Sequence, residues 1–299
     1  MKDPTVIFEE DTHSYWHGSG PLGSDTRTKM VSGTTFIGQF TKPFNRAEII
    51  ARCAMAEIVG PQFWSMFFAN EDVMATEDEL LDFFHYKISE DHYLERKITI
   101  REEWDLGNRR GTALHQEIEE DLYAAGFAKH PFIDIEVPVV KFPKKYDNQS
   151  IVKDLSSLED GAYPELVVWH DDALLAGQAD FPIIYTDPKT EERCVIIIDF
   201  KTNGGYNPNK GLKKREELTK PTYAKTFMKD PISHLYDCTY SKYQLQLSLY
   251  GHLLELHGFK PQPPVVKHFL NYDKEDFEYI KYPYIGKECE SIVATLIED

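Results

Sequence analysis

The hydrophobic positions of the chain repeat first with the period of strands and then with that of helices. Residues 6–36 hold two strand-like segments around a turn rich in glycine, serine and aspartate, which predicts a β-hairpin. Apolar side chains then recur every three or four positions, which predicts helices over residues 47–60, 76–98 and 100–126. We therefore expect an amino-terminal hairpin followed by a helical subdomain.

Strand-like segments dominate after Pro131. Residues 164–187 fit two strands with a turn near 170–173, and an amphipathic helix over 243–258 ends at Gly258. A final helix is expected over 287–299. This order predicts an α/β protein whose central mixed β-sheet is flanked by helices. The other expected strands cover residues 132–142, 194–201, 265–272 and 277–284.

Two regions are expected in the chain. Residues 1–130 would form the hairpin and the helices, which pack on a core formed by residues 131–299. No segment between them is long enough to act as a linker, so we expect one to pack directly on the other.

The composition is that of a soluble globular chain. Of its 299 residues, 41% are hydrophobic and 28% are charged, and no apolar run approaches the ~18 residues of a membrane span. The amino terminus has no apolar core of a signal peptide, and the four cysteines form no CxxC pair. These features predict a cytoplasmic protein with reduced thiols and no membrane partner.

The stretch CVIIIDFKTN, residues 194–203, ends an apolar run with an acid and a lysine two positions apart. Asp199 and Lys201 share one face of the predicted strand, and Phe200 points to the other. The isoleucines before them are apolar on both faces, which predicts a central, buried strand. Charges at its end need partners. Either the two side chains form a plain ion pair, or Asp199 binds a divalent cation through its carboxylate.

Other polar residues occupy unusual positions in the predicted elements. Asp180 lies within another apolar strand, and two carboxylates that meet at one sheet edge repel each other unless a metal is bound. Glu165 begins the preceding strand and either joins this cluster or faces solvent. His115 lies on the 100–126 helix, where a histidine is ordinarily a core or surface residue. Gly111, one turn earlier, costs ~1 kcal/mol relative to alanine in a helix interior.

The later helix adds Gln246 and Tyr250, which share one face and form either a phosphate-binding stripe or an ordinary amphipathic surface. Together these residues form an ordered set: GxxxHxxxE, a Glu-led strand, GxxD, DxK and QxxxY. The set resembles the RecB-like exonuclease branch of the PD-(D/E)XK nuclease superfamily over residues 104–272. Residues 31–45 also resemble the lead-in of phage and mitochondrial genome-maintenance members. The matching residues are Gly111, His115, Glu119, Glu165, Gly177, Asp180, Asp199, Lys201, Gln246 and Tyr250.

The resemblance implies a restriction-endonuclease-like core and Mg²⁺- or Mn²⁺-dependent hydrolysis of phosphodiester bonds. Lys201 would orient the attacking water, with Asp180, Asp199 and Glu165 as further catalytic residues. Gln246, Tyr250, Gly111 and Arg110 would lie against the DNA. The implied metal ligands are His115, Asp180, Asp199 and the carbonyl of Phe200. Some members of the branch hold an iron–sulfur cluster, but the required cysteine cluster is missing here, so none is expected.

The net charge of −17 argues against broad binding to nucleic acid. Residues 207–230 are locally basic, however, and either guide a phosphate backbone or form a solvated loop. A narrow basic channel beside an acidic surface favours threading of single-stranded DNA or a DNA end. The basic residues proposed to contact DNA there are Lys213, Lys214 and Arg215.

An exonuclease of replication, repair or recombination is therefore predicted, in the cytoplasm of a cell or of a phage-infected host. The resemblance also suggests a single-strand-binding or recombination protein as a partner. Three alternatives stay open: a structure-specific endonuclease of the same fold, a nuclease-like scaffold that binds without cleaving, and an unrelated α/β protein with chance motifs.

Overall fold

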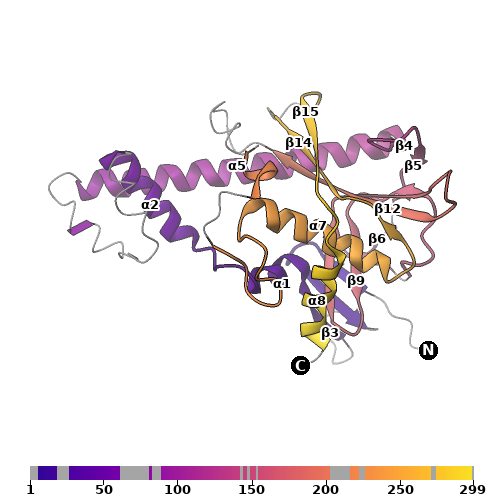
Figure 1. Cartoon of the computed structure of the whole chain (residues 1–299). Helices are drawn as coiled ribbons and strands as arrows, with labels where there is room; N and C mark the ends of the chain where they lie inside the picture. Colours follow the sequence, from indigo (N-terminus) through magenta and orange to yellow (C-terminus); the bar gives the residue numbers. More distant parts are fainter. Residues whose placement is uncertain are drawn as a thin grey trace. The chain divides into compact units, whose positions relative to one another are not determined.

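The structure, a computed structural model, divides the chain into two compact units (Figure 1). Unit 1 comprises Met1–Lys42 and Ala113–Asp299, and unit 2 comprises Pro43–Thr112. The division differs from the expected boundary at residue 130, because the amino-terminal strands pair with later parts of the chain. The described residues are 6–18, 27–60, 81–82, 89–141, 144–146, 149–152, 154–202, 216–221, 226–270 and 274–297.

Unit 2 contains helix α2 (Arg46–Val59) and the first part of α5 (Glu90–Ala125). The Asn45 side chain caps α2 by accepting a hydrogen bond from the Glu48 amide, and Gly60 ends it with a φ of 92°. Apolar side chains of the two helices form a small core of their own around Ala54 and Tyr93. The helix predicted over 47–60 is confirmed. The helices predicted over 76–98 and 100–126 are joined from Glu90 on in the single helix α5, and residues 76–80 and 83–88 lie outside the described residues.

Unit 1 is a mixed α/β structure, which confirms the predicted class. Among its described residues, the longer helices, apart from the end of α5, are α1 (Gly33–Gln39), α7 (Thr239–Glu255) and α8 (Gly286–Ile297). None of the helices that the structure describes is long and apolar enough to cross a membrane. Its strands are β1 (Val6–Glu9), β2 (Ser14–Gly18), β3 (Arg27–Ser32), β4 (Phe127–Lys129), β5 (Glu136–Pro138), β6 (Lys144–Tyr146), β7 (Gln149–Val152), β8 (Gly161–Ala162), β9 (Leu166–His170), β10 (Leu175–Ala179), β11 (Phe181–Thr186), β12 (Arg193–Thr202), β13 (Lys260–Pro261), β14 (Val265–Phe269) and β15 (Phe277–Lys281).

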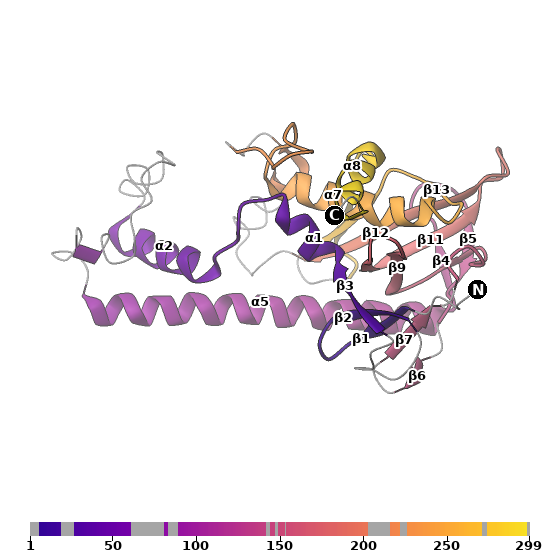
Figure 2. The same cartoon turned by 90° about the horizontal axis from the view of Figure 1, so that it is seen from below.

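Strand β12 is the centre of a mixed sheet in the order β15-β14-β12-β11-β8. It runs parallel to β14 and antiparallel to β11, and seven consecutive residues of it are buried. Its odd-numbered residues Val195 and Ile197 belong to the core under α7, and its even-numbered residues pack against the end of α5. Figure 2 shows α7 along one face of this sheet, beside α8. The predicted central strand is therefore confirmed.

A second sheet has the order β6-β7-β1-β2-β3-β10-β9. Its β10 continues through Asp180 into β11 of the first sheet, so Asp180 lies at the junction of the two sheets. Two local predictions were wrong. The segment over 164–187 forms three strands, because the chain breaks at Asp180. Residues 33–39 form helix α1, because the Ser32 hydroxyl accepts the Thr35 amide as a cap and the helix packs on α7.

Candidate metal centre and its pocket

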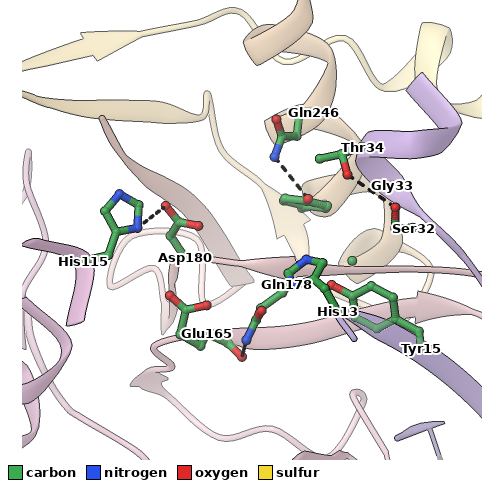
Figure 3. A pocket seen from close by; sticks show the side chains of 12 residues that line it. His13, Tyr15, Ser32, Gly33, Thr34, His115, Glu165, Gln178, Asp180 and Gln246 are labelled. Atoms are coloured by element: carbon green, nitrogen blue, oxygen red, sulfur yellow. Dashed lines mark hydrogen bonds and ion pairs between the residues drawn. The ribbon is translucent and has the colours of Figure 1, made fainter. Parts of the chain in front are cut away.

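A pocket of about 200 Å³ in unit 1 brings together residues from five parts of the chain. Asp180 and Glu165 contribute carboxylates, and the end of α5 contributes His115 (Figure 3). Ligand atoms of these three side chains all lie within 4.8 Å of one another. The remaining lining residues are His13, Tyr15, Ser32, Gly33, Thr34, Gly177, Gln178, Gln246 and Tyr250.

His115 is held by the end of strand β12. Its Nε2 lies 2.8 Å from the carbonyl oxygen of Phe200, and its Nδ1 lies 3.6 Å from Asp180 Oδ2. The same carboxylate oxygen accepts the Phe200 amide at 3.1 Å. A neutral imidazole with its proton on Nε2 donates to the carbonyl and leaves the Nδ1 lone pair facing Asp180. This is the usual arrangement of a metal-binding histidine.

The backbone conformation and the surroundings of Glu165 are both energetically unfavourable. Its φ of 56° is in the left-handed region, which is uncommon for a residue other than glycine and costs of order 1–3 kcal/mol. Its backbone is fixed by the amide, which donates to the Asp180 carbonyl at 2.9 Å. Burial, Asp180, Glu119 and Asp199 together raise the pKa of Glu165 to about 9. A bound cation would offset this crowding of carboxylates.

Asp199 and Lys201 form an ion pair beside this cluster. Asp199 Oδ2 lies 2.7 Å from Lys201 Nζ, and the Asp199 side chain is 3% exposed. Burial raises the pKa of Asp199, Lys201 lowers it, and Asp180 raises it again. Burial lowers the pKa of Lys201, but Asp199 and Asp180 raise it by more, so the ammonium stays charged. The ion pair and the carboxylate cluster are thus electrostatically linked through Asp180.

The predicted metal ligands fall into two groups in the structure. His115 and Asp180 come together as predicted, and Glu165 joins them. Asp199 interacts with Asp180 but lies outside the group of mutually close ligand atoms. The carbonyl of Phe200 contacts His115 and so orients it.

Gln246 and Tyr250 both line the pocket, on the side of α7 that faces it. Gln246 Nε2 donates to the Tyr250 hydroxyl at 3.2 Å. The Tyr250 ring is buried and lies against two glycines: a Cβ atom on Gly177 would be 2.4 Å from Tyr250 Cε1, and one on Gly33 would be 3.2 Å from it. The glycine of the GxxD motif is therefore required by the close approach of this ring.

Sequence inspection did not assign His13, Tyr15 or Gln178 to the site, and it noted Ser32 and Thr34 only within the lead-in at 31–45. In the structure the Ser32 and Thr34 hydroxyls lie 3.4 Å apart at the pocket (Figure 3). Two other predicted residues, Arg110 and Gly111, lie on α5 within unit 2. Lys213, Lys214 and Arg215 lie outside the described residues.

No family model and no curated protein matches the chain. The donor atoms of the pocket are therefore the main guide to its chemistry. One imidazole nitrogen and two carboxylates are a donor set that suits a divalent cation.

Proposed function

We propose that the chain is a divalent-metal-dependent deoxyribonuclease that hydrolyses phosphodiester bonds in single-stranded DNA or at DNA ends. The observation that carries this proposal is the convergence of His115, Glu165 and Asp180 beside the Asp199–Lys201 pair. A divalent cation bound there would lower the pKa of a bound water and neutralise charge on the phosphate.

The protein's own residues have distinct tasks in this proposal. His115, Glu165 and Asp180 would hold the cation, and the Phe200 carbonyl keeps the histidine ring in its orientation. Lys201 would orient the water and stabilise the negative charge that develops on the phosphate. Asp199 holds Lys201 in place through the 2.7 Å ion pair, so it acts as a positioning residue.

The far wall of the pocket supports a single strand as the substrate. Hydroxyl and amide groups of Ser32, Thr34, Gln178 and Gln246 can donate to phosphate oxygens without adding charge. A volume of about 200 Å³ is below the range of common ligand pockets, which suits the backbone of one nucleotide. We also propose that the core around β12 is restriction-endonuclease-like, since its central strand supplies the acid and the lysine of the motif.

The proposal is tested by digesting 5′- and 3′-labelled single- and double-stranded DNA with Mg²⁺, with Mn²⁺ and with a chelator. We expect metal-dependent loss of single-stranded substrate. Asp180→Asn should reduce the rate at least about 10³-fold, because it removes a ligand whose cation stabilises the transition state by several kcal/mol. Asp172→Asn, at an exposed position in the β9–β10 turn, is the matched control and should leave the rate unchanged.

A circular single-stranded DNA substrate distinguishes an exonuclease from an endonuclease. Resistance of the circle supports an exonuclease, and cleavage at the rate of the linear strand would make the chain an endonuclease. If Asp180→Asn cleaves as fast as the unchanged protein, the proposed metal centre is wrong. If the chain binds DNA but cleaves it under none of the metal conditions, it is a non-cleaving scaffold.

A further inference from the structure

Three exposed rings and two lysines lie on β14, β15 and the loop before β5, and none of them lines the pocket. Phe132, Phe277 and Tyr279 are 39%, 37% and 37% exposed. The rings touch one another in edge contacts, with centroids 5.7 Å apart for Phe132–Tyr279 and 5.3 Å apart for Phe277–Tyr279. Lys267 Nζ lies 3.9 Å from the Phe277 ring, and Lys281 Nζ lies 3.4 Å from the Phe132 ring. These five residues are called the aromatic–lysine patch below.

The patch belongs to the same sheet and the same end of the sheet as the candidate metal centre. Lys267 pairs with Phe200 on one side and with Tyr279 on the other, so the three residues form one row across the strands. Phe277 lies in the row that leads to the end of β12 at Thr202. Strand β15 is two strands from β12, which places the patch roughly 10 Å from the strand that supports His115.

The charge of the patch differs from that of the whole chain. Within the described residues, no carboxylate lies within ion-pair distance of Lys267 or Lys281, although the chain carries a net charge of −17. Burial lowers the pKa of Lys267, so its ammonium is poorly hydrated and would be stabilised by an anion. Partly exposed rings, together with ammonium groups that have no carboxylate partner among the described residues, match a ligand that is both flat and anionic.

We infer that the aromatic–lysine patch is a second binding site for single-stranded nucleic acid, which holds the strand outside the pocket. Bases would stack on the Phe277, Tyr279 and Phe132 rings, and the two lysines would contact the phosphates, as in proteins that bind single strands without sequence preference. The row that contains Phe200, Lys267 and Tyr279 connects the patch to the peptide group that holds His115. The role of the patch in capturing a substrate rests on the proposed function.

The test measures the anisotropy of fluorescein-labelled oligothymidylate, with chelator present so that no strand is cut. Phe277→Leu and Tyr279→Leu keep apolar volume but remove the ring face, and each should weaken binding about 10-fold, within the range known for base stacking. Tyr279→Phe keeps the ring and should bind within about 2-fold of the unchanged protein. Exchanging both lysines for methionine should reduce the salt dependence of binding, by roughly 0.7 in log–log slope for each phosphate that is no longer neutralised.

Leu256→Ala, which removes another exposed apolar side chain, is the control and should leave binding unchanged. Hydrolysis of bis(4-nitrophenyl) phosphate with Mn²⁺ engages the pocket alone and separates the two proposals. If hydrolysis is absent but the patch variants bind the oligonucleotide more weakly, the proposed function fails and the patch stands. If the Leu variants bind as tightly as the unchanged protein, the patch proposal is wrong. Loss of self-association in those variants, by sedimentation, with unchanged oligonucleotide affinity would make the patch a protein interface instead.

Discussion

The ten residues of β12 place chemically different side chains on the two faces of the strand. The face toward α7 ends in Asp199 and Lys201, a buried ion pair whose desolvation must be offset by close geometry. The face toward the end of α5 carries Phe200, whose ring packs between Phe181 and Phe269 at centroid distances of 5.6 and 6.1 Å. One face therefore carries charge into the core, and the other is apolar from Cys194 through Phe200.

The backbone of β12, which lies between these two faces, contacts two residues of the candidate metal centre. The Phe200 amide donates to Asp180 and the Phe200 carbonyl faces His115, whereas the phenyl ring packs in the apolar core. Phe200 therefore contacts the residues of the candidate site through its peptide groups, whereas Asp199 and Lys201 interact with the site through their side chains. Substitutions on the two faces should accordingly have different effects on stability and on hydrolysis.

The largest effect is expected from breaking the ion pair. Lys201→Met leaves the carboxylate of Asp199 buried without a partner, which should lower the free energy of unfolding by about 4 kcal/mol, besides abolishing hydrolysis. Denaturant unfolding near pH 8 measures the loss. The double variant Asp199→Asn with Lys201→Met removes both charges and should recover much of it. A loss below about 1 kcal/mol for Lys201→Met would mean that the pair behaves as an exposed one.

Much of β12 and its surroundings could be predicted from sequence because the signals there are local. The apolar run at 194–198 identifies a central strand, and alternation alone assigns Asp199, Phe200 and Lys201 to their faces. Embedded acids in neighbouring strands then predict the meeting of Asp180 with the end of β12. Helix α1 was not predicted, because its Thr34, Thr35 and Phe36 favour strands and only the Ser32 cap and contacts with α7 favour the helix.

The composition of the cluster depends on tertiary geometry and was predicted only in part. Glu165 stands close to His115 because its backbone takes a positive φ between β8 and β9, which no sequence pattern indicates. Asp199, the more obvious ligand from the motif, is engaged by Lys201 instead. The hydroxyls of Ser32 and Thr34 reach the pocket only through the unexpected helix α1.

A pH effect of as much as about 3 kcal/mol is expected on the α5 side of the sheet. Burial, and then Lys281, lower the pKa of His130 from 6.5 to about 4, and its Nδ1 accepts the amides of Phe132 and Ile133. The unfolded chain binds this proton near pH 6.5 and the folded chain only near pH 4. The contribution of neutral His130 is therefore intact above pH 6.5 and is lost as the pH falls toward 4.

His130→Asn isolates this effect, because its side-chain oxygen can accept the same amides but does not titrate. As the pH falls from 7 to 4, the free energy of unfolding of the unchanged protein should decrease relative to that of the variant. Denaturant unfolding at several pH values measures it. Parallel curves for the two proteins would show that His130 does not stay neutral in the folded chain.

A smaller effect is expected where α7 approaches β10. Gly177→Ala places a methyl group 2.4 Å from Tyr250 Cε1, so the ring must move, at a cost of about 2 kcal/mol for an overpacked core. Movement of Tyr250 also disturbs its hydrogen bond with Gln246, and single-strand cleavage should slow. Gly38→Ala is the matched control, since a Cβ atom there meets nothing within 4 Å; it should be neutral or stabilising by up to about 1 kcal/mol. Equal stability of the two variants would contradict the close packing of the ring.

The smallest effect is the sharpest test of the division between the faces. Phe200→Leu keeps an apolar side chain of similar size, so unfolding should become easier by only about 1 kcal/mol. The amide and carbonyl that hold Asp180 and His115 are unchanged, and the rate of metal-dependent cleavage should stay within about 3-fold. Denaturant unfolding and labelled-strand digestion measure the two quantities on the same protein. A large loss of cleavage with little loss of stability would mean that the phenyl ring itself, through its 5.8 Å edge contact with His115, positions the histidine.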